Sequence, residues 1–272
     1  MRHRISFTAI VGIVIILVCV GGAIFAPWVA PHDPNETMGG RWDPPSAEHW
    51  LGLDQIGRDM FTRILYGGRI SIGLAMVATI LAFVVGTITG LAATVFGGWV
   101  DILLSRIADV VLSIPNLMWA LIILSGFGTG ATIIVLTIGF LYSIYVFRVA
   151  RAVAMNIAVL EYVEAARLRG EGLMWVILRE ILPNALPPLA AEFGLRFCFA
   201  FLFVAALSFL GLGVQPPDPD WGSMVKDNAL AIPAGIAAPL YPAAAIALLT
   251  IGVNMVVDWL LSIYSRPQGE NA

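Results

Sequence analysis

The chain has 272 residues, of which 59% are hydrophobic and 12% charged, and its mean hydropathy is +0.89. Soluble domains are roughly half apolar and a quarter charged, so a soluble monomer could not bury this much apolar surface. The net charge of −3 provides no basic field for a nucleic acid, which excludes nucleic-acid binding.

Charge-free stretches predict the membrane-spanning helices, because a spanning helix needs about 20 apolar residues with few charges. They cover residues 5–32, 70–100, 110–147, 197–217 and 228–257. The third stretch is long enough for two helices, which the glycine-rich turn at 125–130 separates. We therefore predict an all-α integral membrane protein with six transmembrane helices, at 8–28, 70–96, 102–124, 131–149, 189–211 and 237–263.

These spans divide the chain into three parts. Residues 1–30 hold the first transmembrane helix, whose apolar run exceeds the roughly 7–15 residues of a signal-peptide core, so we expect it to be retained. Residues 31–69 form a periplasmic or external segment. Residues 70–265 form the transmembrane core, which includes a cytoplasmic coupling loop at 151–187.

The positions of arginine set the expected orientation, since cytoplasmic loops carry the excess of Lys and Arg. An arginine-rich region lies around the coupling loop, and its members are Arg148, Arg151, Arg167, Arg169 and Arg179. With an even number of spans, a cytoplasmic coupling loop places both termini in the cytoplasm, together with Arg2, Arg4 and Arg266.

The coupling loop carries the most specific pattern. Its Ala, Arg and Glu residues favour a helix up to Arg169, after which Gly170 can adopt the left-handed conformation that ends helices. A second short helix is expected to end before Pro183. The pattern resembles the EAA loop of ABC importer permeases, and the matching residues are Glu164, Ala165, Ala166, Gly170, Leu182 and Pro183.

In that family the loop docks into a groove of the ATPase subunit. The two alanines would allow a close approach, and Gly170 would allow a sharp reversal of the chain. Glu180 departs from the histidine that peptide permeases commonly carry there. The alternative interpretation is an ordinary amphipathic linker between spans.

Two further motifs are similar to those of dipeptide, oligopeptide and nickel permeases. One is HWLGLDQIGRD at 49–59, and the other is LSFLGLGVQPP at 207–217. The resemblance weakens at Val204, where an acidic residue is common, and near the C-terminus, where Val257, Leu261 and Ser262 replace the usual Gly, Arg and Asp. The loss of a carboxylate at Val204 favours a peptide-like or other organic solute over a divalent cation.

Several weaker signals have structural interpretations. Gly86 and Gly90 predict close helix packing within the subunit, with a contact between subunits as the alternative. Glu192 and Arg196 predict an ion pair, with a gate as the alternative. His32 and His49 repeat no known metal-site spacing, so we predict a solvated loop and no metal site.

Motifs for enzymatic chemistry are absent from the sequence. The single lysine, Lys226, lacks the Gly-Lys-Ser/Thr context of an ATP-binding P-loop, and no zinc-protease or serine-hydrolase motif occurs. We expect no enzyme activity, catalytic residue or cofactor in this chain, with ATP and Mg²⁺ bound by partner ATPase subunits.

The resemblance implies the type I ABC importer permease fold in the bacterial inner membrane. It also implies four kinds of partner: a second homologous permease subunit, two ATPase subunits, an extracytoplasmic solute-binding protein and membrane lipid. The expected cargo is a dipeptide or oligopeptide. The alternatives are nickel or another small organic solute, such as an opine or sugar derivative, and an ATP-independent transporter or channel, which predicts buried acids or inverted repeats.

Overall fold

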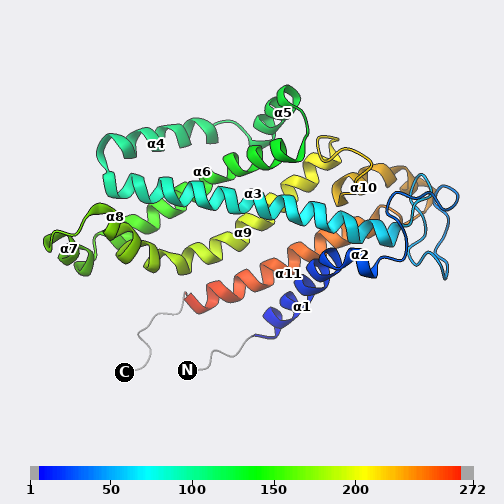
Figure 1. Cartoon of the computed structure of the whole chain (residues 1–272), viewed down its shortest axis with the longest axis horizontal. Helices are drawn as coiled ribbons and strands as arrows, with labels where there is room; N and C mark the ends of the chain where they lie inside the picture. Colours follow the sequence, from blue (N-terminus) through cyan, green and yellow to red (C-terminus); the bar gives the residue numbers. More distant parts are fainter. Residues whose placement is uncertain (1–5, 265–272) are drawn as a thin grey trace.

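The computed structural model describes residues 6–264, which form helices joined by loops together with two isolated β-bridges (Figure 1). Arg2, Arg4 and Arg266, on which the predicted orientation of the termini partly rests, lie outside the described residues. The elements are α1 (Phe7–Ile24), α2 (Ala26–Val29), α3 (Met60–Phe96), α4 (Gly98–Leu112), α5 (Asn116–Phe127), α6 (Ala131–Ala158), α7 (Glu161–Leu168), α8 (Leu173–Trp175), the π-helix η1 (Val176–Ile181), α9 (Leu182–Phe209), α10 (Trp221–Asn228), the 3₁₀-helix η2 (Ala229–Ala234) and α11 (Leu240–Tyr264).

Five helices of the described chain are long and apolar enough to cross a membrane. They are α1, α3, α6, the continuous run of α8, η1 and α9, and α11. A sixth span is present if α4 and α5 count as one broken span, since the two helices meet at 85°. The predicted all-helical membrane fold is thus confirmed, and the count of six depends on this bent pair.

The break between α4 and α5 corrects the continuous helix expected over 102–124. It lies at residues 113–115, where Pro115 has the extended angles φ −55° and ψ 137°. Proline has no N–H to continue the hydrogen-bond ladder, and it disfavours the helical conformation of the residue before it. The apolar sequence continues through this point, so hydropathy alone does not reveal the break.

A second correction concerns the helix expected to end before Pro183. The chain stays helical from Leu173 to Phe209, because the π-helical turn η1 leads directly into α9. A wider turn moves the proline ring away from the carbonyl groups that it would otherwise meet. The side-chain amide of Asn184 donates to the carbonyl oxygen of Glu180 at 2.6 Å, which satisfies one acceptor in this irregular turn.

Two helix pairs pack side by side along the bundle. α3 packs along α6, and Gly86 and Gly90 face α6 so closely that a Cβ at either position would lie 2.5 Å from the Ser143 carbonyl oxygen or 2.8 Å from the Ala150 Cβ. The predicted packing within the subunit is therefore confirmed. α1 lies beside α11, and α9 contacts α3, α6 and α11 (Figure 1).

The long helices define two ends of the molecule. Figure 1 shows α7 and α8 at the left end, and the loop of residues 31–59 with α10 at the right end. The start of α1 and the end of α11 both point toward the left end, as a chain with an even number of spans requires. We call these the α7 end and the α10 end. Which of them faces the cytoplasm stays a prediction.

Candidate functional site

At the α7 end, the sequence around Glu164 folds into a short helix with favourable end charges. α7 carries Glu161 and Glu164 in its first turn and Arg167 in its last turn. Acidic side chains near a helix N-terminus and basic ones near its C-terminus stabilise the helix dipole, typically by about 0.3–1 kcal/mol each. The five charged residues between 161 and 171 also keep this segment in water: Glu161, Glu164, Arg167, Arg169 and Glu171.

Gly170 ends α7 in a Schellman motif. Its φ of +86° lies in the left-handed region, which confirms the conformation predicted for it. The N–H of Gly170 donates to the carbonyl oxygen of Arg167 at 3.0 Å, and the N–H of Glu171 donates to that of Ala166 at 3.2 Å. These two bonds satisfy the last carbonyl groups of α7 and reverse the chain toward α8.

The two alanines of the motif have different environments. Ala166 is fully buried beside Val163, and both pack in a cluster with η1, α6 and α9. Ala165 and Glu164 are exposed on the other side of α7. Only Ala166 therefore serves close packing inside the chain, whereas Glu164 and Ala165 remain on the surface that a partner could contact.

Leu182 and Pro183 directly follow η1 and are the first two residues of α9. Leu182 is half-buried and packs against the same cluster, while Pro183 is exposed. α7 packs against η1, which contains Glu180. Burial, and to a smaller extent the negative charge of Glu180, raises the pKa of Tyr162 in α7. The structure thus brings α7, η1 and the start of α9 into one packed unit.

Sequence reasoning missed a group of exposed apolar side chains around this turn. Leu168 is 82% exposed and Met174 is 63% exposed, on either side of Gly170. Val159, Leu173 and Leu178 are exposed nearby. Groups of exposed apolar side chains are typical of surfaces that contact another protein or a membrane. The sequence feature that could have revealed them is the occurrence of large apolar residues within a charged stretch.

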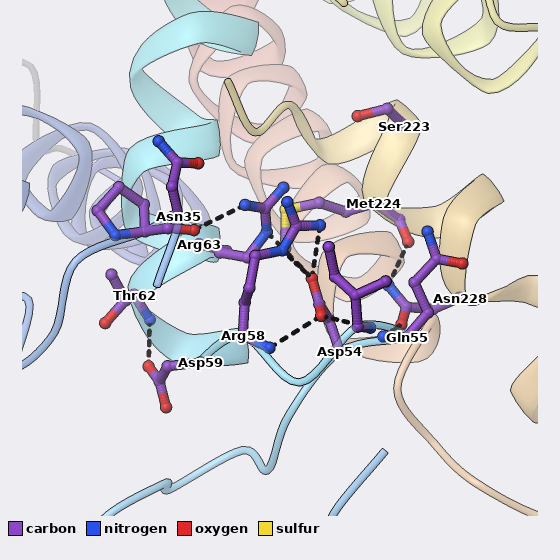
Figure 2. A network of polar contacts seen from close by, with 12 residues as sticks. Asn35, Asp54, Gln55, Arg58, Asp59, Thr62, Arg63, Ser223, Met224 and Asn228 are labelled. Carbon is purple, nitrogen blue, oxygen red and sulfur yellow. Dashed lines mark hydrogen bonds and ion pairs between the residues drawn. The ribbon is translucent and has the colours of Figure 1, made fainter. Parts of the chain in front are cut away.

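At the α10 end, a buried ion network fixes the loop of residues 31–59 to α3 (Figure 2). The Asp54 carboxylate accepts from the Arg58 side chain at 2.8 Å and from the backbone N–H groups of Ile56 and Arg58 at 2.9 and 3.0 Å. Arg63 of α3 forms an ion pair with it at 3.3 Å and donates to the Pro34 carbonyl oxygen at 2.7 Å. Asp54 and Arg63 are nearly inaccessible to solvent, so removal of either would leave the charge of the other buried and without compensation.

Asn228 joins this loop to α10. Its side-chain oxygen accepts from the indole N–H of Trp42 at 3.1 Å and from the backbone N–H of Gln55 at 3.0 Å, and its amide donates to the Met224 carbonyl oxygen at 2.8 Å. Figure 2 shows Asn228 beside Gln55 and Met224. Nearby, burial raises the pKa of Asp227, against the opposing effect of Lys226 and the arginines of the network.

α10 is also anchored on α3 through Trp221. The indole N–H of Trp221 donates to the Ile64 carbonyl oxygen at 2.8 Å, and its backbone N–H donates to the Ser71 hydroxyl at 3.0 Å. The loop, α10 and the first turns of α3 therefore form one rigid platform at this end. Sequence reasoning identified the motif at 49–59 but not these partners.

Within the helical bundle, the predicted ion pair between Glu192 and Arg196 is confirmed. The Arg196 guanidinium also lies over the Tyr145 ring at 5.1 Å. Val204 and Val257 are buried in the apolar core, so at these departures an apolar side chain fills a packed position. Leu261 is exposed, and the Ser262 hydroxyl donates to the Trp259 carbonyl oxygen.

Comparison with known proteins identifies the family. A profile described as binding-protein-dependent transport system inner membrane component matches residues 82–267, and one described as the N-terminal TM domain of oligopeptide transport permease C matches residues 6–45. The chain belongs to the binding-protein-dependent transport permease family. Its resemblance to peptide permeases, inferred from the motifs, is thereby confirmed.

Curated relatives of this permease extend over most of its length. The dipeptide transport system permease protein of Alkalihalophilus pseudofirmus is 38% identical over 253 residues, which cover 93% of this chain and 83% of the relative. The probable D,D-dipeptide transport system permease protein of Escherichia coli is 35% identical, with coverages of 97% and 88%. The glutathione transport system permease protein of Shigella boydii is 34% identical, with coverages of 95% and 85%. This permease is thus a multi-pass membrane protein, and these relatives are named as permeases of dipeptide and glutathione transport systems.

Proposed function

We propose that the chain is one of two permease subunits of an ATP-driven importer that moves a dipeptide or oligopeptide across the bacterial inner membrane. Its relatives carry names of dipeptide and glutathione transport, which supports a peptide-like solute. Six spans and two cytoplasmic termini complete the proposal. A second, homologous permease subunit forms the other half of the translocation path.

The observation that carries this proposal is the exposed apolar turn at the α7 end. Gly170 reverses the chain so that Leu168 and Met174 project from a compact, charged knob. Such a knob fits a groove on a partner better than it fits lipid, because its charged residues would be costly to bury there. We assign the ATPase subunit as that partner, with Glu164, Ala165 and Gly170 on the docking surface and Ala166, Leu182 and Pro183 supporting it.

Coupling follows from the packing behind the knob. Val163 and Ala166 pack against η1, which continues without a break into α9. A displacement of α7 by the ATPase therefore reaches a membrane helix through packed side chains. In this way the binding of ATP to partner subunits, which also hold Mg²⁺, would bias the access state of the permease.

The platform at the α10 end is the proposed contact for a solute-binding protein. It is rigid, because Asn228 holds the loop against α10 and Trp221 holds α10 against α3. A rigid surface lowers the entropic cost of docking a partner. The binding protein would then deliver the solute to the path, and the permease itself needs no catalytic residue.

The docking assignment is tested by replacing Leu168 with Asp. Leu168 is 82% exposed, so the substitution should leave the fold intact while it places a charge in the proposed contact. We expect the ATPase subunits to be lost, at least in part, from the purified complex. Leu230→Asp is the matched control, since Leu230 is 70% exposed but lies in η2, near the α10 end. Equal recovery of ATPase subunits with both variants would contradict the assignment.

A further inference from the structure

Three potential metal ligands meet at the α10 end of the molecule. His32 follows α2, His49 lies within the loop, and Asp59 precedes the first turn of α3. One ligand atom from each lies within 4.8 Å of the other two. The two imidazole rings are 5.1 Å apart, centroid to centroid. Their meeting is not predictable from the sequence, because no regular helix or strand spacing relates the three residues.

The pair of His49 and Asp59 has the spacing of two ligands of one ion. His49 Nδ1 lies 3.1 Å from Asp59 Oδ1. Two ligand atoms about 2.1 Å from a tetrahedral zinc ion are roughly 3.4 Å apart, so a shift of a few tenths of an ångström would suffice. The other carboxylate oxygen, Oδ2, accepts from the Thr62 N–H at 2.8 Å and so orients the carboxylate.

His32 is held in a similar way by a bond outside the cluster. Its Nε2 lies 3.1 Å from the Glu48 carbonyl oxygen. A carbonyl oxygen can only accept, so Nε2 is the protonated nitrogen and Nδ1 keeps a free lone pair. Imidazoles that bind metal ions usually donate their other N–H to an oxygen in this manner, which fixes their orientation.

The charge of Asp59 is available to a cation. The nearest arginines, Arg58 and Arg63, are paired with Asp54 at 2.8 and 3.3 Å. Figure 2 shows the Asp59 carboxylate turned away from that group. Asp59 is 1% exposed, so its charge lies in a setting of low dielectric constant that strengthens its attraction for a cation.

We propose that His32, His49 and Asp59 bind one divalent transition-metal ion of the zinc class, with water completing the coordination. Two imidazole nitrogens and one carboxylate oxygen suit Zn²⁺ and its analogues Co²⁺ and Ni²⁺, whereas Mg²⁺ and Ca²⁺ prefer oxygen ligands alone. The ion links the chain just after α2, the middle of the loop and the start of α3. The ion therefore has a structural role in the platform and is separate from the transported solute.

The test uses the full permease complex, purified without a histidine tag and freed of metal with a chelator. Titration with Zn²⁺ should reveal one site per chain that the variant carrying His32→Ala and His49→Ala lacks. Co²⁺ should give the visible absorption of a tetrahedral nitrogen- and oxygen-bound ion, and excess Mg²⁺ should not displace it. Asp59→Asn keeps a residue that caps helices well. It removes a direct ligand, so it should lower Zn²⁺ affinity by at least the roughly 10–100-fold that loss of an outer-shell partner costs.

Two controls keep the outcome decisive. Glu48→Gln should bind Zn²⁺ like the unsubstituted chain, because Glu48 contributes only its backbone carbonyl to the site. His3 is retained in every variant, so any Zn²⁺ that it binds would remain as residual binding in the double variant. If the double variant does not fold, His32→Gln replaces it, since among residues 6–264 the His32 side chain is hydrogen-bonded to the Glu48 carbonyl oxygen alone. Failure of the unsubstituted complex to bind Zn²⁺ stoichiometrically, or equal binding by His32→Gln, would overturn the proposal.

Discussion

Gly170 combines a left-handed backbone with open space. Its φ is +86°, and no atom lies within 4 Å of the position that a Cβ would take. A side chain there meets no clash, so its cost is that of the backbone conformation, about 1–2 kcal/mol for an L-residue. We expect Gly170→Val to reduce solute-stimulated ATP hydrolysis and uptake by the complex in proteoliposomes several-fold, because the turn presented to the ATPase would change shape.

Gly172 provides the matched control for this substitution. It is also exposed and open, but its φ of −69° and ψ of 155° are extended angles that valine adopts readily. Gly172→Val should therefore leave coupled transport nearly unchanged. Similar losses in both variants would mean that bulk alone is harmful in this loop and would argue against a specific role for the left-handed turn.

Residues of the coupling loop could be predicted individually, but their surroundings could not. The left-handed position of Gly170 follows from local chain chemistry and was correctly expected. The different exposures of Ala165 and Ala166 depend on which side of α7 meets η1. That side is set by the path of the chain after Gly170, which the motif does not encode.

At the scale of helices, the contact between α3 and α6 offers a stability test. A Cβ at Gly86 would lie 2.5 Å from the Ser143 carbonyl oxygen, and backbone cannot move away easily. We expect Gly86→Ala to destabilise the permease by about 1–3 kcal/mol, the range for overpacking a core. Its apparent Tm in detergent should fall by several degrees. Gly73→Ala lies on the same helix with nothing within 4 Å, and it should leave Tm unchanged or slightly raised.

A lower Tm for Gly73→Ala than for Gly86→Ala would contradict the packing of α3 on α6. Both positions carry glycine in one helix, so the gain of helix propensity on going from Gly to Ala is similar at both and cannot account for a difference between them. The comparison therefore isolates the close approach of the two helices.

The hydrogen bonds between the loop and α10 predict that two substitutions destabilise this junction to different extents. Asn228→Leu removes three hydrogen bonds and leaves the Trp42 and Gln55 donors without their acceptor, at a cost of about 1–3 kcal/mol. Trp42→Phe removes the indole N–H together with part of the ring but leaves the Asn228 oxygen its bond from Gln55, so the lost hydrogen bond should cost about 1 kcal/mol. Limited proteolysis within residues 31–59 should be fastest for Asn228→Leu and intermediate for Trp42→Phe. Unchanged cleavage in both would contradict the anchoring role of Asn228.

Helix positions were predictable from hydropathy, but helix continuity was not. Pro115 breaks the helix expected over 102–124, as its chemistry dictates. Pro183, Pro187 and Pro188 have the same chemistry, yet they lie within α9. The π-helical turn at η1 precedes them, and no feature of local sequence distinguishes these prolines from the one that breaks a helix.

For the whole molecule, the orientation can be tested with reporter fusions. Trp50 is 62% exposed in the loop at the α10 end, and Glu171 lies at the α7 end. We expect alkaline phosphatase to be active when fused after Trp50 and inactive when fused after Glu171, with the opposite pattern for a fluorescent protein. The reverse result would place the arginine-rich loop outside and contradict the orientation proposed here.

The assembly of the α10 end could not have been predicted from this single sequence. Asn228 contacts Trp42 and Gln55, which are 186 and 173 residues away in the chain. These contacts carry no periodic pattern, and they arise only when the bundle brings both segments to the same end. By contrast, the membrane class and the family motifs depend on composition and short stretches of sequence.

α3 contains 37 residues in one uninterrupted helix, which gives it a length of about 56 Å. A bilayer with its headgroups is only about 40–45 Å thick, so this helix is a rod longer than the membrane that it crosses. Its first turns carry the platform, and its last turns pack against α6 near the α7 end. A rotation of about 5° around its midpoint would move its two ends by about 2 Å in opposite directions. Through such a lever, a displacement at one end of α3 would move a partner docked at the other end, on the opposite side of the membrane, without any bending of the helix.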